Sequence, residues 1–355
     1  MWQTSRETLL SQPPPENPYE LKCYDFLKEW INGTEVITLF TSGSTGTPKP
    51  IDLYRNQLIS SALMTGEALK LSAGSRALVC LNVNYIAGMM MLIRGMELGW
   101  ELTITEPSAN PLLHLNHALR FDFTSMVPMQ LAACLHDTAT REAVTRFDKI
   151  LLGGAPVSPV LQHEISLLTN QVYHSYGMTE TVSHVALKQL SPMKEDDYNV
   201  LPGIRFGVDE RGCLYISGAV TNSQIVQTND LVEITSKNTF KWIGRADNII
   251  NSGGVKIVLD RIDEIVSDVF FRLNYTHVFF TWFEEDNLLG QKLILMVEAR
   301  PDQMASEQVL VEIRKQVSAY ETPKHVYFAE QFFRTATDKI DKRRTAQTIL
   351  KLPNE

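Results

Sequence analysis

The stretch Thr41-Ser42-Gly43-Ser44-Thr45-Gly46-Thr47-Pro48-Lys49 holds two glycines, five hydroxyl side chains and one lysine in nine residues. The run Val36–Phe40, which favours a β-strand, leads into it. Glycines let the backbone turn tightly and point its N–H groups inward, while hydroxyls and a lysine add donors and positive charge. This chemistry suits a polyphosphate. The spacing is not that of a Walker loop, and a flexible loop is the alternative interpretation.

Composition narrows the class of protein. The chain has 355 residues and a formal net charge of −8, which disfavours nucleic acid as a partner. The length suits two or three domains. Four widely spaced cysteines without a C-x-x-C pair indicate a reducing compartment, so we expect a cytoplasmic protein. The N-terminus lacks an apolar signal core, and the most apolar window, 77–93, is too short and polar to cross a membrane.

Strands and helices alternate along the first half of the chain, which predicts an α/β sheet. We expect helices at 54–71 and 88–98, and strands at 76–81, 102–105, 124–127, 149–152 and 171–174. The last two strands run into the turns Gly153-Gly154-Ala155 and Ser175-Tyr176-Gly177. Ligands of such sheets bind at the carboxyl ends of strands, where these turns fall.

The pattern changes near Asn199, where short alternating strands predict a small β-rich subdomain. Another boundary falls near Gly244-Arg245-Ala246-Asp247. Beyond it, helices at 259–269 and 306–319 and strands at 277–282 and 292–298 predict a compact α+β tail domain. We therefore expect a large domain over 1–245 and a small one over 246–355.

Five segments stand in a fixed order along the chain. They are TSGSTGTPK (41–49), GGA (153–155), YGMTET (176–181), TNDLVEI with KWIGRADNIINSGG (228–234 and 241–254), and RTATDKIDKRR (334–344). Together they resemble the adenylate-forming superfamily of acyl-CoA synthetases, adenylation domains and luciferases. The resemblance implies an α/β adenylate-forming fold with a mobile C-terminal domain. It also implies a two-step reaction, in which a carboxylate and ATP give an acyl-adenylate and coenzyme A then displaces AMP.

The resemblance also implies roles for individual residues in binding ATP. The 41–49 loop would hold the β- and γ-phosphates, with Lys49 adding charge, and Tyr176 would stack on adenine. Thr179 would donate to the α-phosphate or the carboxylate, and Glu180 would hold Mg²⁺. The full set expected at the nucleotide is Thr41, Ser42, Gly43, Ser44, Thr45, Gly46, Lys49, Gly153, Gly154, Ala155, Tyr176, Gly177, Met178, Asp230 and Arg245.

The tail domain would supply the remaining groups. Lys339 would bridge the attacking carboxylate and the α-phosphate and neutralise charge in the transition state. Asp247 matches the family's hinge. After rotation about it, the loop Ser252-Gly253-Gly254 would leave room for the thin chain of coenzyme A.

Ordinary explanations compete with some of these roles. Lys339 lies in a basic run, so a solvated face is the alternative, although the Arg334-Thr-Ala-Thr-x-Lys pattern selects it over Lys342. The pair His114-x-x-His117 fits a surface better than a metal site. The run Met89-Met90-Met91 fits a core better than a cofactor site, with the floor of an acyl pocket as the alternative.

The chain departs from the family pattern in several places. Only 40 residues precede Thr41, so we expect part of the usual large domain to be missing or replaced. A contact within a homodimer is one way in which it would be replaced. At three positions where the family usually has glycine, this chain has Pro50, Asn229 and Asp338. A histidine often found near Tyr85 is absent. None of these changes removes a charge that the chemistry requires.

Within the superfamily, several stretches look most like the ligases that join o-succinylbenzoate to coenzyme A for menaquinone synthesis. These are residues 125–131, 151–155 and 176–186. The aromatic carboxylate of such a substrate would need a cation or several donors. Candidate residues for the acyl pocket are Tyr85, Ser125, Gln130, Ser183 and His184. The alternatives are another acyl- or aryl-CoA ligase, a carrier-loading adenylating enzyme, and a non-catalytic adenylate-binding relative.

Overall fold

The computed structural model describes residues 1–41, 49–116, 118–335 and 340–350. Contacts divide the chain into two compact units, which we describe separately. The first unit comprises Met1–Asp209, Leu214–Thr228 and Ile234–Lys241, and the second comprises Glu210–Cys213, Asn229–Glu233 and Trp242–Glu355. No helix in the described part of the chain is long and apolar enough to span a membrane.

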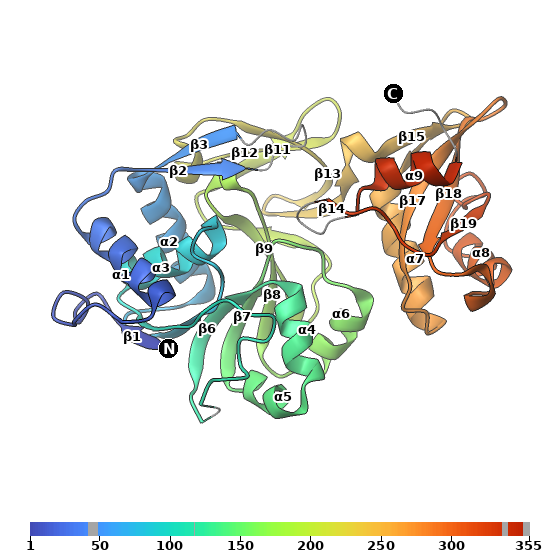
Figure 1. Ribbon diagram of the computed structural model, residues 1–355. Helices are drawn as coiled ribbons and strands as arrows, with labels where there is room; N and C mark the ends of the chain where they lie inside the picture. Colours follow the sequence, from blue (N-terminus) through green and yellow to red (C-terminus); the bar gives the residue numbers. More distant parts are fainter. Residues whose placement is uncertain (42–48, 117, 336–339, 351–355) are drawn as a thin grey trace. The chain divides into compact units, whose positions relative to one another are not determined.

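The first unit is built on a long sheet whose centre is parallel (Figure 1). Its hydrogen-bonded order is β1-β5-β4-β6-β7-β8-β9-β10-β14-β13-β12-β11. Strands β12, β13 and β14 contain residues of both units. The strands are β1 (Trp2–Thr4), β4 (Arg76–Val79), β5 (Glu101–Ile104), β6 (Phe121–Met126), β7 (Phe147–Leu152), β8 (Gln171–Gly177), β9 (His184–Ser191), β10 (Tyr198–Val200), β11 (Arg205–Val208), β12 (Cys213–Ser217), β13 (Val226–Ser236) and β14 (Thr239–Arg245).

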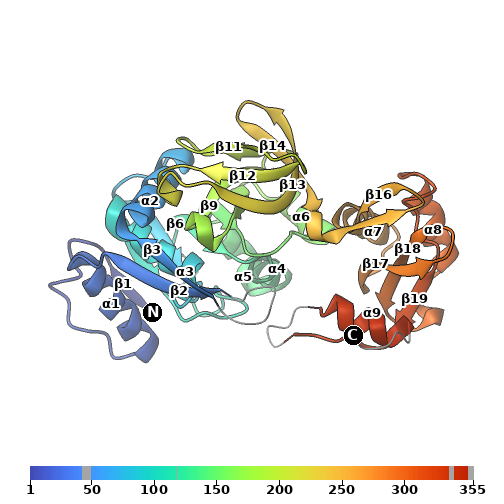
Figure 2. The same cartoon turned by 90° about the horizontal axis from the view of Figure 1, so that it is seen from above.

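Two groups of helices cover the parallel strands on opposite faces (Figures 1 and 2). Leu78, Ile150 and Val172 point towards α4, α5 and α6, with which they share one apolar core. On the other side, α3 packs so closely that a Cβ on Gly95 would lie 2.5 Å from Leu102. The helices are α1 (Pro18–Ile31), α2 (Arg55–Leu69), α3 (Ile86–Leu98), α4 (Pro128–His136), α5 (Thr138–Val144) and α6 (Pro159–Ser166).

The glycine- and hydroxyl-rich stretch connects two strands of a hairpin. β2 (Val36–Thr41) pairs antiparallel with β3 (Lys49–Tyr54), and Thr41 opposes Lys49 at the end of the ladder. The strand expected before the stretch is therefore confirmed, whereas β3 was not foreseen. The two strands form a separate two-stranded sheet.

The second unit contains a mixed sheet with helices on both faces. Alternation along β18 sends Leu293 and Leu295 into one core with α7 and α8, and Ile294 and Met296 into another with α9. Its elements are β15 (Ile249–Ser252), β16 (Val255–Val258), α7 (Leu259–Arg272), β17 (Val278–Asp286), β18 (Gly290–Glu298), α8 (Ser306–Arg314), β19 (Val326–Ala329) and α9 (Lys342–Leu350).

One of the expected turns is a strand segment instead. Ser175-Tyr176-Gly177 forms the end of β8, because β9 pairs with it as far as Gly177 and His184. The prediction of a turn was wrong there because an antiparallel neighbour extended the strand, and pairing of this kind overrides local preference. The segment containing Asp230 lies within β13.

Candidate active site

Residues Ser42, Gly43, Ser44, Thr45, Gly46 and Lys339 lie outside the described residues. Thr41 and Lys49 are placed as the end of β2 and the start of β3, and their side chains are not described. The remaining candidates fall in two sets, one in each unit.

The first set gathers at the carboxyl ends of the parallel strands. Gly153 follows β7, and its N–H donates to the Met126 carbonyl at the end of β6 over 3.2 Å. A Cβ at Gly153 would lie 2.6 Å from the Ser175 hydroxyl, and Gly154 has a φ of +80°, so both positions favour glycine. These glycines therefore leave open backbone at the edge where α/β sheets bind ligands.

An aromatic cluster holds Tyr176 beside this backbone. Its ring meets Phe240 edge-on at 5.3 Å and Tyr198 edge-on at 5.8 Å between centroids. The Tyr198 hydroxyl lies 2.7 Å from His174 Nδ1, and His174 Nε2 lies 3.1 Å from the Ala155 carbonyl oxygen. Burial is the main cause that lowers the pKa of His174. The neutral ring therefore links the aromatic cluster to the 153–155 backbone.

The chain then turns sharply after β8. Gly177 leaves no room for a Cβ against the Ser183 backbone, and Met178 precedes the 3₁₀ turn η1 (Thr179–Thr181). Thr179 is half-buried and Glu180 is exposed. A carboxylate at an exposed turn can reach a bound cation, as its predicted role requires.

Arg94, which was not foreseen from the sequence, lies in α3 and is only 2% exposed. Its Nε donates to the Thr65 hydroxyl over 3.1 Å and its Nη2 to the Ser183 hydroxyl over 2.9 Å. Ser183 Oγ lies 2.8 Å from Ser61 Oγ, and Thr65 Oγ1 lies 3.2 Å from His184 Nε2. Within the described part of the chain, Arg94 forms no ion pair.

Burial without a carboxylate partner shifts the pKa values of Arg94 and His184, the two ionisable groups of this network. It lowers the pKa of Arg94 to about 9. It also lowers the pKa of His184 well below its ordinary value, and the neighbouring Arg94 adds to that effect. The sequence signal that could have pointed to Arg94 was an arginine within a mostly apolar helix. A buried arginine usually has a partner, so its position there indicates a polar site.

The other acyl-pocket candidates differ in their surroundings. The Ser125 hydroxyl is buried at the end of β6 without a hydrogen-bond partner among the described residues. The Gln130 amide is engaged by backbone, since it donates to the carbonyls of Cys80 and Ser108 and accepts from Val127 N–H. Tyr85 precedes α3 and is 70% exposed.

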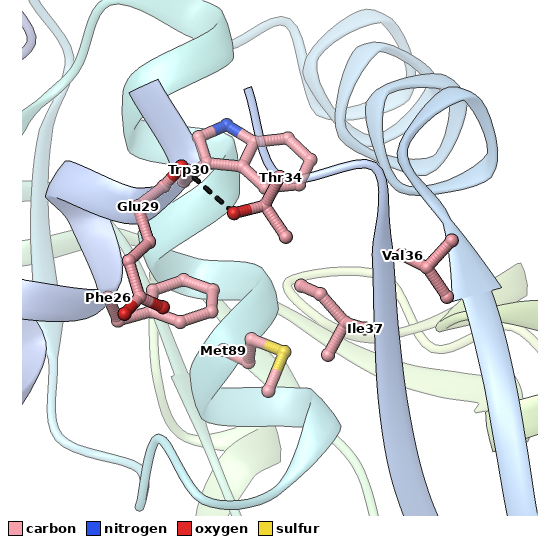
Figure 3. A pocket seen from close by; sticks show the side chains of 7 residues that line it. All are labelled: Phe26, Glu29, Trp30, Thr34, Val36, Ile37 and Met89. Carbon is pink, nitrogen blue, oxygen red and sulfur yellow. Dashed lines mark hydrogen bonds between the residues drawn. The ribbon is translucent and has the colours of Figure 1, made fainter. Parts of the chain in front are cut away.

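A cavity of about 230 Å³ lies beside α1 and β2 (Figure 3). Its lining residues are Phe26, Glu29, Trp30, Thr34, Val36, Ile37 and Met89. Met90 and Met91 are fully buried in the core, as expected, while Met89 borders this cavity. The volume is below the range usual for ligand pockets, so the cavity adds no ligand to the account.

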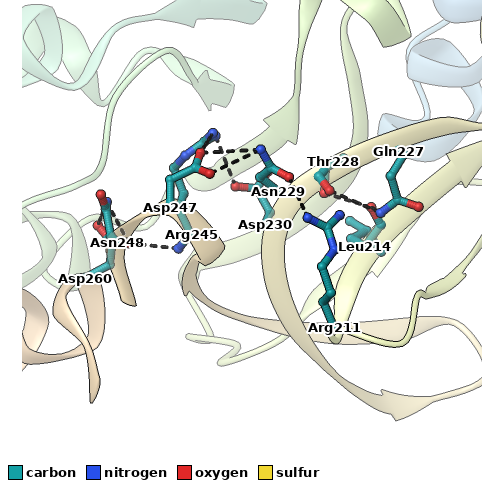
Figure 4. Close-up of polar contacts among 10 residues, drawn as sticks. All are labelled: Arg211, Leu214, Gln227, Thr228, Asn229, Asp230, Arg245, Asp247, Asn248 and Asp260. Carbon is teal, nitrogen blue, oxygen red and sulfur yellow. Dashed lines mark hydrogen bonds and ion pairs between the residues drawn. The ribbon is translucent and has the colours of Figure 1, made fainter. Parts of the chain in front are cut away.

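The second set lies in the second unit (Figure 4). Asp230 is 9% exposed, and its Oδ1 lies 3.6 Å from Arg245 Nη1. Arg245 Nη2 donates to Asp247 over 2.7 Å, and Asn229 donates to the same carboxylate over 3.3 Å. The hydrogen bond to Asp247 is the main cause that raises the pKa of Arg245. The candidate hinge residue Asp247 thus bonds to Arg245, which contacts Asp230, and to Asn229, which precedes Asp230 in the sequence.

Gly253 and Gly254 form the two-residue connection of a hairpin between β15 and β16. Their φ values of +60° and +84° are those of a tight turn that favours glycine at both positions. The hydroxyl of Ser252 is fully buried and has no hydrogen-bond partner within the described ranges. Hairpin geometry alone therefore accounts for both glycines.

The chain is similar to known proteins in sequence and in fold. Residues 11–208, more than half of the chain, match the family described as AMP-binding enzyme. The chain belongs to the AMP-binding enzyme family. It is accordingly an AMP-forming ligase of the acyl-CoA synthetase type.

Several relatives are similar over most of the chain. The crystal structure of an acyl-CoA synthetase (AMP-forming)/AMP-acid ligase II-like protein from Dyadobacter fermentans is 59% identical, with a TM-score of 0.68, covering 98% of this chain and 99% of that one. The 2-succinylbenzoate–CoA ligase of Staphylococcus epidermidis is 25% identical over an alignment of 337 residues, which covers 86% of this chain and 68% of the relative. The o-succinylbenzoate CoA synthetase of Bacillus subtilis, solved with its acyl-adenylate intermediate, shares the fold at 20% identity, with a TM-score of 0.72 and coverage of 90% and 69%.

Proposed function

We propose that this AMP-binding enzyme activates a carboxylic acid that carries a second carboxylate, and transfers its acyl group to coenzyme A. The first candidate substrate is o-succinylbenzoate. The observation that supports it is the buried guanidinium of Arg94, which has only hydroxyl partners among the described residues. The names of relatives at 25% identity point to the same acid.

The electrostatic environment of Arg94 favours an anionic ligand. A buried charge costs several kcal/mol unless an opposite charge and hydrogen bonds compensate for it. The hydroxyls of Thr65 and Ser183 satisfy donors of the guanidinium without neutralising it. The half-buried Ser183, which bonds to the guanidinium, follows shortly after the 3₁₀ turn that carries Thr179 and Glu180. A ligand carboxylate in this region would supply the missing negative charge.

The nucleotide would occupy the edge formed by the 153–155 and 176–181 segments. Adenine would lie against Tyr176 and the backbone of Gly153 and Gly154, and Thr179 would donate to the α-phosphate. Asp230 would accept hydrogen bonds from the ribose hydroxyls, and Arg245 would support it. Lys49, on the hairpin, would add charge at the outer phosphates.

Magnesium would be held by Glu180 together with phosphate oxygens. No cluster of three or more histidine, cysteine or acidic residues that could hold a metal occurs in the part of the chain that the structure describes. One exposed carboxylate fits Mg²⁺, because this ion is usually bound by one or two carboxylates and the substrate's phosphates. The ion would neutralise the charge of the leaving pyrophosphate.

The reaction proceeds by two displacements. A carboxylate oxygen of the acid attacks the α-phosphorus of ATP, and the bond to pyrophosphate breaks. The thiol of coenzyme A loses its proton, its sulfur attacks the acyl carbon, and AMP leaves. Lys339 would neutralise charge in the first step, and rotation about Asp247 would bring Ser252, Gly253 and Gly254 to coenzyme A for the second.

The test is pyrophosphate release with a matched pair of acids, ATP and Mg²⁺. o-Succinylbenzoate and 4-oxo-4-phenylbutanoate differ only in the aromatic carboxylate. We expect release with the first acid to exceed that with the second by at least about 100-fold, the effect of leaving a buried polar site unpaired. We also expect a thioester when coenzyme A is added, and a large loss of release in Lys339→Ala.

Other outcomes would favour the alternatives. Equal rates with both acids would refute the role of the second carboxylate and move the enzyme to another acyl- or aryl-CoA ligase. Release without acceptance of coenzyme A would indicate a carrier-loading enzyme. Binding of ATP without release for any acid would indicate the non-catalytic relative.

A further inference from the structure

Val182 adopts a backbone conformation that a valine rarely takes. It has a φ of +66° and a ψ of −57°, and the Ser183 N–H donates to the Thr181 carbonyl over 2.7 Å. This hydrogen bond from residue i+2 to residue i closes a γ-turn with positive φ at its centre, which is a rare and strained turn. For a β-branched residue it is a clear outlier. Strained residues of this kind gather at functional sites.

Packing on both sides imposes this turn. The side chain of Val182 is fully buried. The Thr181 hydroxyl accepts from Met178 N–H over 3.1 Å and lies 2.8 Å from the Ser183 carbonyl oxygen. The Ser183 hydroxyl is itself held by Ser61 and Arg94. The fixed turn therefore sits between the 3₁₀ turn that carries Thr179 and Glu180 and the network around Arg94.

We propose that Val182 is a positioning residue for adenylate formation. The inference rests on the proposed function, because it takes Thr179 as a nucleotide ligand and Ser183 as part of the acid's pocket. The γ-turn fixes the separation of these two groups, and so the position of the attacking carboxylate relative to the α-phosphorus. Its buried side chain holds the turn in one conformation, whereas glycine would let the turn relax. In-line displacement depends on such placement, and a shift of about 1 Å can cost about 100-fold in rate.

The test compares Val182→Gly and Val182→Ala with the matched control Val185→Ala. Val185 is a buried valine on the neighbouring strand β9, only 2% exposed, outside the turn. For each protein we would measure kcat for pyrophosphate release, the KM of the acid, the Kd of ATP and the midpoint of thermal unfolding. Val182→Gly is expected to lower kcat at least about 10-fold while Kd for ATP stays within about twofold. Val182→Ala, which keeps a side chain in the turn, is expected to fall between Val182→Gly and wild type.

The control separates positioning from a general loss of packing. Val185→Ala is expected to lower the unfolding midpoint at least as much as Val182→Gly, with kcat within about threefold of wild type. A kcat of Val182→Gly within about threefold of wild type would overturn the inference, and so would equal losses of kcat in Val182→Gly and Val185→Ala. Wild-type protein that releases no pyrophosphate with any acid would overturn both this inference and the proposed function. Active wild type with an unaffected Val182→Gly would overturn this inference alone.

Discussion

Replacing Arg94 by methionine should stabilise the ligand-free protein while removing its selectivity for a dicarboxylate. Burial lowers the pKa of this guanidinium to about 9, which corresponds to about 5 kcal/mol against the charged form. The variant loses two hydrogen bonds from a charged donor, worth about 3 kcal/mol together. The difference predicts a gain of about 2 kcal/mol in the free energy of unfolding.

Urea unfolding followed by circular dichroism at pH 7.5 measures this gain. Arg76→Met is the matched control, because Arg76 is half-exposed and its Nε lies 3.5 Å from Asp122. Exposed pairs contribute little, so the control should change stability by less than about 1 kcal/mol. In the same Arg94→Met protein, release with o-succinylbenzoate should fall to the rate with 4-oxo-4-phenylbutanoate. An Arg94→Met protein less stable than wild type would refute the view that the guanidinium is an uncompensated buried charge.

Three further changes test other parts of the structure. The lowered pKa of His184 keeps it neutral in the folded state while the unfolded chain takes up a proton below about pH 6.5. Its contribution to stability is therefore present above that pH and lost on acidification, by about 1 kcal/mol between pH 6.5 and 5.5. Urea titrations should show less of this loss in His184→Asn, and an unchanged slope would contradict the assignment. Lys342→Met removes the cation 2.9 Å from the partly buried carboxyl of Asp263, whose pKa desolvation already raises. It should lower stability by about 1–2 kcal/mol at pH 7.5, and the loss should shrink on acidification, because protonation of Asp263 removes the need for a cation; a loss that grows on acidification would be inconsistent with this pairing. Gly177→Ala places a Cβ against the Ser183 backbone and should lower the thermal midpoint, at a cost of about 1–3 kcal/mol, whereas an unchanged midpoint would show that the turn can yield.

Several strands along the chain, and the turn that follows β7, could be predicted because both depend on local sequence. Runs such as Lys149–Leu152 are apolar and short, and Gly153-Gly154-Ala155 follows directly. The length of β8 could not be predicted, since it depends on the pairing of Tyr176 with Ala186 ten residues later.

The acid's side of the site was less visible in the sequence. Arg94 stands between Ile93 and Gly95 in an apolar helix, and only the fold shows that Ser183 and Thr65 surround it. The local sequence pattern can indicate that a charged residue is buried, but it does not indicate which side chains surround it in the fold. The conformation of Val182 likewise arises from long-range packing, which no preference of valine indicates.

Isotope transfer is the most direct test of whether the acid is activated as an adenylate. The enzyme would be supplied with o-succinylbenzoate labelled with ¹⁸O in its aliphatic carboxylate, together with ATP, Mg²⁺ and coenzyme A, and the products examined by mass spectrometry. Attack of a carboxylate oxygen on the α-phosphorus predicts one ¹⁸O atom in AMP and none in pyrophosphate. Unlabelled AMP, or label in inorganic phosphate beside ADP, would contradict the account.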